Sequence, residues 1–108
     1  MAKHFVEMLE TLESEGKVRI EIASTPVLII HDAGEVYAVN DRCPHMRASL
    51  YKGDYEAGVV TCKKHNAEID VKTGEILKKA HLGPIKMPTR RAKTYNAFVE
   101  DGKVFVEI

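Results

Sequence analysis

The sequence predicts an all-β domain, a small antiparallel β-sandwich or barrel that carries an insert of short strands and loops. The chain has 108 residues, which is enough for one domain with a modest core. Its apolar residues occur in many short runs, and turn residues separate these runs at short spacing. We find no repeat, linker or low-complexity tract, so we expect a single domain over residues 1–108.

Four strands are expected in the first part of the chain, at residues 5–8, 18–22, 27–30 and 36–39. Residues 18–22 alternate apolar and charged side chains, which is typical of a half-buried strand. Residues 27–30 are continuously apolar and therefore predict a strand covered on both faces. Asp32-Ala33-Gly34 predicts a hairpin turn. Residues 9–16 are expected to form an acidic, turn-rich connection with at most one helical turn.

The second half predicts an insert that interrupts the base of the domain. Short strands are expected at residues 58–61, 68–71 and 75–77, after a first loop at 40–51, and a third loop follows at 80–85. A closing hairpin is expected from 96–100 and 103–107, turned at Asp101-Gly102. We therefore expect the base at about 1–39 and 89–108, and the insert at about 40–88.

The two cysteines of the chain each have a histidine close downstream, in Cys43-Pro44-His45 and in Cys62-Lys63-Lys64-His65. So short a separation lets both side chains of a pair turn toward one point at the tip of a loop. Thiolates and imidazoles are metal ligands, and two of each predict a metal site. If the cysteines were only small buried hydrophobic residues, these matched pairs would be a coincidence.

Two metal sites use this set of ligands. Zinc takes two cysteines and two histidines tetrahedrally, usually with like ligands close together in the sequence. In a two-iron two-sulfur cluster with mixed ligands, two cysteines hold one iron and two histidines hold the other. Here each pair joins a cysteine to a histidine, so each loop would give one ligand to each iron. The pattern fits the iron–sulfur cluster better than zinc.

The chain resembles the Rieske-type ferredoxins over nearly its whole length. The matching segments are residues 41–45, 48–50, 58–65, 69–70, 73–75, 83–85 and 101–106. The resemblance implies one [2Fe-2S] cluster per chain, with Cys43 and Cys62 on the inner iron and His45 and His65 on the outer iron. It also implies a carrier of single electrons from a flavin-dependent reductase to a terminal oxygenase or another acceptor. We expect this carrier to be a monomer.

The departures from the family predict a low reduction potential. In the high-potential Rieske proteins, a disulfide clamps the site and two hydroxyl groups donate to the cluster sulfurs. Ala48 and Lys64 stand at the disulfide positions here, and Ala67 and Ile69 stand at the hydroxyl positions. Hydrogen bonds to sulfur stabilise the reduced state, so their loss lowers the potential within the ~−150 to +300 mV Rieske range. The positive charge of Lys63 and Lys64 would raise it by a smaller amount.

The composition is ordinary for a soluble globular domain, with 44% hydrophobic and 30% charged residues. No apolar run approaches the ~18 residues that a transmembrane helix needs, so we expect no membrane partner. The first residues carry charge and predict no export signal. Both cysteines are assigned to metal, which suits a reducing cytoplasm.

Charge is unevenly distributed along the chain, although the formal net charge is zero. Residues 1–41 hold three basic and eight acidic side chains, whereas residues 42–94 hold twelve basic and five acidic ones. The insert is therefore basic. Such a surface is either simply solvated or steers the site toward acidic partners. We expect no nucleic-acid partner, because the chain has no recognised motif or aromatic platform.

No pattern in the sequence predicts an enzyme. There is no nucleophile elbow, no phosphate-binding glycine loop and no flavin or nicotinamide motif. Asp41, Asp54, Glu68 and Asp70 are expected to be turn and surface residues. The function predicted is electron transfer. The alternatives are a zinc-stabilised interaction module that uses the same four ligands, and a redox sensor whose basic face regulates a partner.

Overall fold

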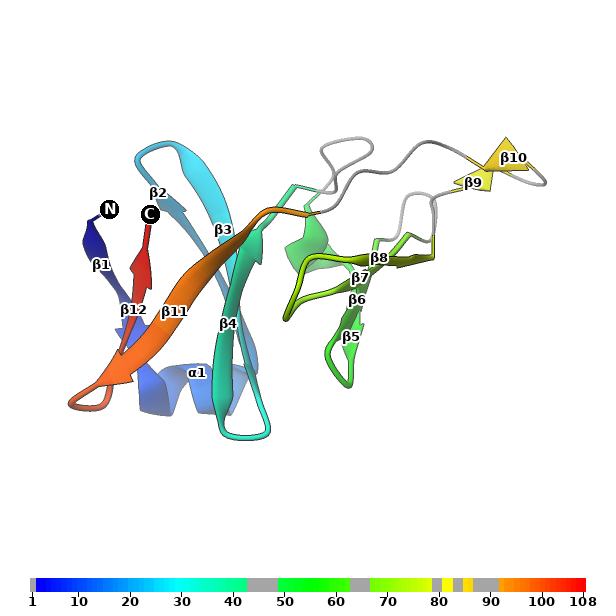
Figure 1. Cartoon of the computed structure of the whole chain (residues 1–108). Helices are drawn as coiled ribbons and strands as arrows, with labels where there is room; N and C mark the ends of the chain where they lie inside the picture. The colour runs from blue at the N-terminus through cyan, green and yellow to red at the C-terminus, as the bar shows by residue number, and fades with distance from the viewer. Residues whose placement is uncertain (1, 43–48, 63–66, 79–80, 83–84, 87–91) are drawn as a thin grey trace.

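In the computed structural model (Figure 1), the two ends of the chain form one sheet of six antiparallel strands, which curls into a nearly closed barrel. The structure describes residues 2–42, 49–62, 67–78, 81–82, 85–86 and 92–108. The strands of this sheet are β1 (Lys3–Met8), β2 (Lys17–Ile22), β3 (Thr25–Asp32), β4 (Glu35–Asn40), β11 (Thr94–Glu100) and β12 (Lys103–Glu107). Their order across the sheet is β1-β12-β11-β4-β3-β2. The all-β prediction is confirmed.

Strand β3 is buried on both faces, as its continuous apolar run predicts. Val27 and Ile29 pack in the core of the six-stranded sheet, whereas Leu28 and Ile30 pack in a second core that includes residues of the inserted segment. All four side chains are fully buried. Burial of one such side chain contributes roughly 1.5–3 kcal/mol, so β3 links the two cores energetically as well as in space.

The segment after β1 is the helix α1 (Leu9–Glu15), so the prediction of a turn-rich connection was wrong. Packing explains the difference, because Leu12 is fully buried in the core of the six-stranded sheet. Gly16 ends the helix with a positive φ of 83°, and its N–H donates to the Leu12 carbonyl oxygen at 2.7 Å. Within the described residues, no helix has the length and hydropathy needed to cross a membrane.

The insert contributes a second antiparallel sheet of four short strands, in the order β5-β6-β7-β8. These strands are β5 (Asp54–Glu56), β6 (Val59–Thr61), β7 (Glu68–Asp70) and β8 (Ile76–Lys78), and a 3₁₀ turn, η1 (Leu50–Lys52), precedes them. Strand β5 was not predicted. A two-stranded hairpin of β9 (His81–Leu82) and β10 (Ile85–Lys86) follows. In Figure 1 the four-stranded sheet lies beside the six-stranded one, on the side away from the two termini.

Tyr55 joins the two sheets through a part-buried pair of hydrogen bonds. Its hydroxyl donates to Asp32 Oδ2 at 2.7 Å and accepts from the Gly58 N–H at 2.9 Å. Burial, followed by the hydrogen bond to Asp32, raises the pKa of Tyr55 from 10.0 to about 12. The folded state therefore favours the neutral phenol.

We expect this pair to stabilise the fold below pH 10 and to lose that effect as the pH rises from 10 toward 12. Urea unfolding between pH 9 and 12 would show a steeper loss of stability in the wild type than in Tyr55→Phe. At neutral pH the variant should be less stable by about 1–2 kcal/mol. Parallel pH profiles for the two proteins would contradict this account.

Candidate metal centre

One of the four predicted ligands, Cys62, lies among the described residues. Cys43, His45 and His65 lie outside them. Cys62 follows β6 directly, and its side chain is 1% exposed. It belongs to the same core as Val60 and Ala67. The strand thus delivers a buried thiol at the start of the second predicted ligand loop.

The base of this second loop is closed by strand pairing. Thr61 of β6 and Glu68 of β7 are paired in register, and the Cys62 N–H donates to the Ala67 carbonyl oxygen at 2.8 Å. The chain therefore leaves the sheet at Cys62 and re-enters it at Ala67. Both ends of the loop are fixed by backbone hydrogen bonds, which limits where a ligand within it can lie.

Gly53, the residue after η1, lies directly against Thr61, the residue before Cys62. Its backbone lies so close to Thr61 that a Cβ at this position would overlap the Thr61 carbonyl oxygen. Its φ of −81° is ordinary, so glycine is required here for space and not for conformation. Because Thr61 immediately precedes Cys62, this contact places the segment that follows the first loop next to the start of the second.

Asp41, at the start of the first loop, is hydrogen-bonded both to β3 and to the residue that follows the loop. The Asp41 N–H donates to the Pro26 carbonyl oxygen of β3 at 3.0 Å, and the Asp41 carbonyl oxygen accepts from the Leu50 N–H at 2.6 Å. Arg42 and Ser49, the residues on either side of 43–48, form an isolated antiparallel bridge. We call Asp41, Arg42, Ser49 and Leu50 the neck of the first loop. The residues on either side of 43–48 are thus held together at one place beside β3.

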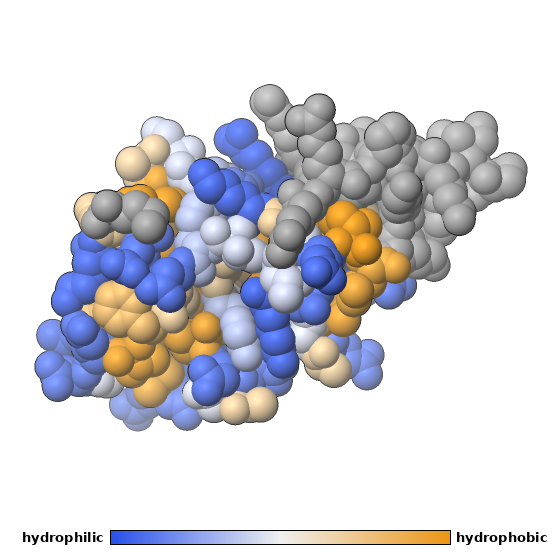
Figure 2. Space-filling view, in the orientation of Figure 1, coloured by the Kyte–Doolittle hydropathy of each residue, from blue (hydrophilic) through white to orange (hydrophobic). Residues whose placement is uncertain are grey.

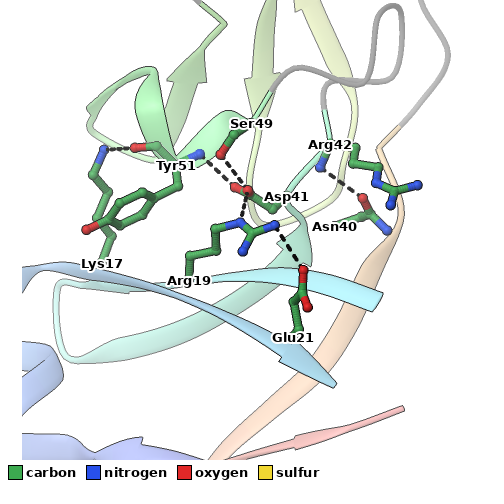
Figure 3. Close-up of polar contacts among 8 residues, drawn as sticks. All are labelled: Lys17, Arg19, Glu21, Asn40, Asp41, Arg42, Ser49 and Tyr51. Atoms are coloured by element: carbon green, nitrogen blue, oxygen red, sulfur yellow. Dashed lines mark hydrogen bonds and ion pairs between the residues drawn. The ribbon is translucent and has the colours of Figure 1, made fainter. Parts of the chain in front are cut away.

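The Asp41 carboxylate is buried at this neck, at 1% exposure, so the prediction of a turn and surface residue was wrong for Asp41. It accepts from Arg19 Nε at 2.7 Å, from Ser49 Oγ at 2.5 Å and from the Tyr51 N–H at 2.7 Å (Figure 3). No local sequence pattern indicates this role, because Arg19 and Asp41 are separated by 22 residues. A buried carboxylate needs such partners, since desolvation without them is costly.

Two basic residues of the edge strand β2 reach this neck. The hydrogen bond to Asp41 is the main cause that raises the pKa of Arg19 above its ordinary value. Lys17, two residues earlier in the strand, donates from Nζ to the Tyr51 carbonyl oxygen at 2.6 Å and to that of Gly53 at 3.1 Å. Residues with this spacing share one face of a strand, so β2 contacts both the neck and η1.

The surface of the insert carries both signs of charge, and the predicted basic character is not uniform. Exposed cations at described positions are Arg42, Lys52, Lys72 and Lys93. Acidic side chains lie on one face of β5 and β7, where the register aligns Asp54 with Thr61 and Thr61 with Glu68, while Glu68 pairs with Lys78 of β8. Asp54, Thr61 and Glu68 line a shallow surface hollow together with Glu56. Figure 2 shows apolar side chains over this sheet beside the residues drawn in grey, and Leu77 of β8 is 53% exposed.

A family model for the Rieske [2Fe-2S] domain matches residues 3–95 of the chain. The chain belongs to this family. It is therefore a carrier of single electrons with one [2Fe-2S] cluster per chain. The matches do not support the alternative of a zinc-stabilised module.

The chain is also similar to ferredoxin subunits of dioxygenases. It is 33% identical over 110 residues to the 3-phenylpropionate/cinnamic acid dioxygenase ferredoxin subunit of Photorhabdus laumondii, and the match covers 100% of this chain and 96% of that protein. The subunit of the same name from Escherichia coli K12 is 34% identical over 96 residues, which covers 87% of this chain and 83% of that one. Ferredoxin subunits carry electrons, and this agrees with the prediction that the chain is not itself an enzyme.

Solved structures have the same fold. The ferredoxin of carbazole 1,9a-dioxygenase from Nocardioides aromaticivorans IC177 superposes with a TM-score of 0.76 at 24% identity, covering 98% of this chain and 97% of that one. A chain in a complex of reduced oxygenase and oxidized ferredoxin in carbazole 1,9a-dioxygenase gives a TM-score of 0.79 at 23% identity. The match covers 96% of this chain and 91% of that one. The Rieske-like fold predicted for the chain is confirmed.

The described residues fit such a cluster. The second loop starts at a buried thiol, the residues on either side of it are hydrogen-bonded to each other, and Gly53, which follows the first loop, lies against Thr61. Ala67 and Ile69, which stand where high-potential relatives have hydroxyl groups, are fully buried in the core that contains Cys62. Their side chains have no donor to offer.

We predict that Ala67→Ser raises the reduction potential. A serine hydroxyl at this buried position would donate to the site and stabilise the reduced state. One charge-assisted hydrogen bond is worth about 1.5–3 kcal/mol, which is on the order of 60–130 mV for a one-electron couple. Redox titration followed by visible absorption measures the shift, and Ala97→Ser, in the other core, is the control. An unchanged potential in a protein with an intact spectrum would contradict the prediction.

Proposed function

We propose that the chain is the ferredoxin component of an oxygenase system, which takes single electrons from a flavin-dependent reductase and passes them to a terminal oxygenase. The observation that carries this proposal is the match to a dioxygenase ferredoxin subunit over 96% of that subunit's length. A solved complex between an oxygenase and a ferredoxin of the same fold adds support.

We further propose that Cys43, His45, Cys62 and His65 hold the cluster, with the cysteines on the inner iron and the histidines on the outer one. The burial of Cys62 supports an inner position for its thiolate. When bound, the cluster accepts and releases one electron. The protein's own contribution is to fix the two loops and to keep water from the thiolate side.

The proposal includes the organisation and setting of the carrier. We propose one domain over residues 1–108, with a base at about 1–39 and 89–108 and an insert at about 40–88. The break between the two sheets supports this division, since η1 and strands β5 to β10 all lie within residues 50–86. We also propose that the carrier is a monomer located in the cytoplasm. That reducing compartment would keep both thiols reduced and available to metal.

The electron acceptor should dock against the basic side of the insert. Exposed Arg42 and Lys52 lie at the neck of the first loop and in η1, where they can steer an acidic surface toward the site. Oxidation of the reduced ferredoxin by its acceptor should therefore slow about tenfold as salt rises from low to high ionic strength.

The terminal oxygenase of the Escherichia coli 3-phenylpropionate system is a practical surrogate acceptor. Stopped-flow absorption would follow oxidation of the dithionite-reduced ferredoxin. Lys52→Glu should slow this step, whereas Lys103→Glu, in β12 of the base, should not. Absence of any electron transfer to this and other oxygenases would count against the proposed function. A rate independent of salt would count against the basic docking side alone.

A further inference from the structure

We propose that Asp41, held by Arg19, is a positioning residue for the first ligand loop and so controls how tightly the cluster is retained. Neither residue is a predicted ligand. The inference rests on the proposed ligand set, in which Cys43 and His45 belong to this loop.

Three donors converge on the Asp41 carboxylate from two parts of the chain that are distant in sequence (Figure 3). Arg19 comes from the edge strand β2, Ser49 from the exit of the loop and Tyr51 from η1. The carboxylate is 1% exposed, so these hydrogen bonds are made largely away from water. Removing it would leave the Ser49 hydroxyl and the Tyr51 N–H, both in part-buried hydrogen bonds, without this acceptor, which is costly.

The network lies at the neck of the loop and not elsewhere in the core. Asp41 is two residues before Cys43, and its carbonyl oxygen accepts from Leu50 on the other side of the loop. The same residue therefore binds the entry and the exit of the loop, through its main chain and its side chain together. A displacement of Asp41 must move both ends of the segment that carries two ligands.

Arg19 connects this neck to the six-stranded sheet. Its Nε donates to Asp41, while its guanidinium also approaches Glu21 Oε1 at 3.6 Å on the solvent side. The Glu21 side chain is 62% exposed and does not take part in the hydrogen bonds of Asp41. An exposed pair of this length contributes little. Glu21→Gln is thus a matched control, because it removes one ionic contact of Arg19 and leaves the neck intact.

Residues that orient metal ligands from outside typically change metal affinity by about 10–100-fold when they are replaced. We expect Asp41→Asn and Arg19→Gln to release iron at least tenfold faster than the wild type. Ser49→Ala should change the rate in the same direction by a smaller factor. Glu21→Gln should remain within twofold of the wild type.

The experiment measures iron release from the holoprotein to the chelator ferrozine, together with the EPR g values of the dithionite-reduced protein. A core variant of the base, Val104→Ala, shows what a general loss of stability does to iron release, since Val104 lies in the other hydrophobic core. The positioning role is supported if Asp41→Asn and Arg19→Gln release iron faster than Val104→Ala while losing no more free energy of unfolding. Their g values should also differ from those of the wild type. Release that only follows global stability, with wild-type g values, overturns the positioning role.

If Asp41→Asn does not fold, Arg19→Gln and Ser49→Ala decide the question, because their side chains are partly exposed and their loss is milder. The wild type is assayed first and needs no redox partner. A wild type without iron and sulfide would overturn the ligand assignment itself, and a wild type that holds its cluster but reduces no oxygenase would leave the positioning result standing.

Discussion

Cys62→Ala is expected to give a folded but colourless protein that holds no iron or acid-labile sulfide. The wild type should be red-brown, with two of each per chain. The change removes a thiolate ligand from a loop whose two ends stay fixed by the Cys62–Ala67 hydrogen bond, which the main chain makes. Alanine is close to cysteine in size and polarity when both are buried, so the core should lose little more than about 1 kcal/mol.

Visible absorption, iron and sulfide analysis, and circular dichroism test this expectation together. His31→Ala is the matched control, because His31 lies in β3 and its backbone N–H, at 3.0 Å from the Gly16 carbonyl oxygen, is unaffected by the change. We expect the control to keep its full spectrum. Loss of colour in His31→Ala, or a coloured Cys62→Ala protein, would show that the ligands are assigned wrongly.

Most of the strands could be predicted because their signal is local. The apolar run of β3 and the alternation in β2 follow from how a strand presents its side chains, and Asp101-Gly102 is a familiar hairpin turn. The turns at Ala23-Ser24 and Ala57-Gly58 also use positive φ values, but alanine and serine give little sign of it. The turn at 57–58 leads out of β5, which has only three residues and was missed.

The sequence offers candidate ligands for the site but gives no indication of the residues that support them. Two Cys/His pairs are visible in the sequence because metal coordination restricts residue type and spacing. The carboxylate of Asp41 resembles any surface acid until the fold brings Arg19 and Ser49 to it across 22 and 8 residues. Gly53 likewise has an ordinary φ, and only the neighbouring Thr61 carbonyl explains why it has no side chain.

Gly74→Ala is expected to lower the free energy of unfolding by about 2–5 kcal/mol, the largest loss among glycine-to-alanine changes at the described positions. Two independent costs combine at this position. Its φ of +79° is left-handed, which costs an L-residue roughly 1–2 kcal/mol. A Cβ there would also overlap the carbonyl oxygen of Ala92, and such overpacking adds about 1–3 kcal/mol.

The position matters to the site because Gly74 joins the two sheets. Its N–H donates to the Asp70 carbonyl oxygen at 2.7 Å, and its own carbonyl oxygen accepts from the Ala92 N–H at 2.8 Å. Ala92 is buried in the core that contains Cys62. Relief of the overlap must therefore shift either β7, which follows the second ligand loop, or the segment that leads into β11. We expect faster loss of the cluster together with the loss of stability.

Gly58→Ala separates the two costs. Gly58 has the same kind of backbone, with φ +86°, but the nearest atom to an added Cβ is Lys72 Cε at an ordinary 3.7 Å. This variant should lose only the conformational part, about 1–2 kcal/mol. Urea unfolding of both variants, followed by circular dichroism, measures the difference. If Gly74→Ala is no less stable than Gly58→Ala, the close approach of Gly74 to Ala92 does not hold the two sheets together.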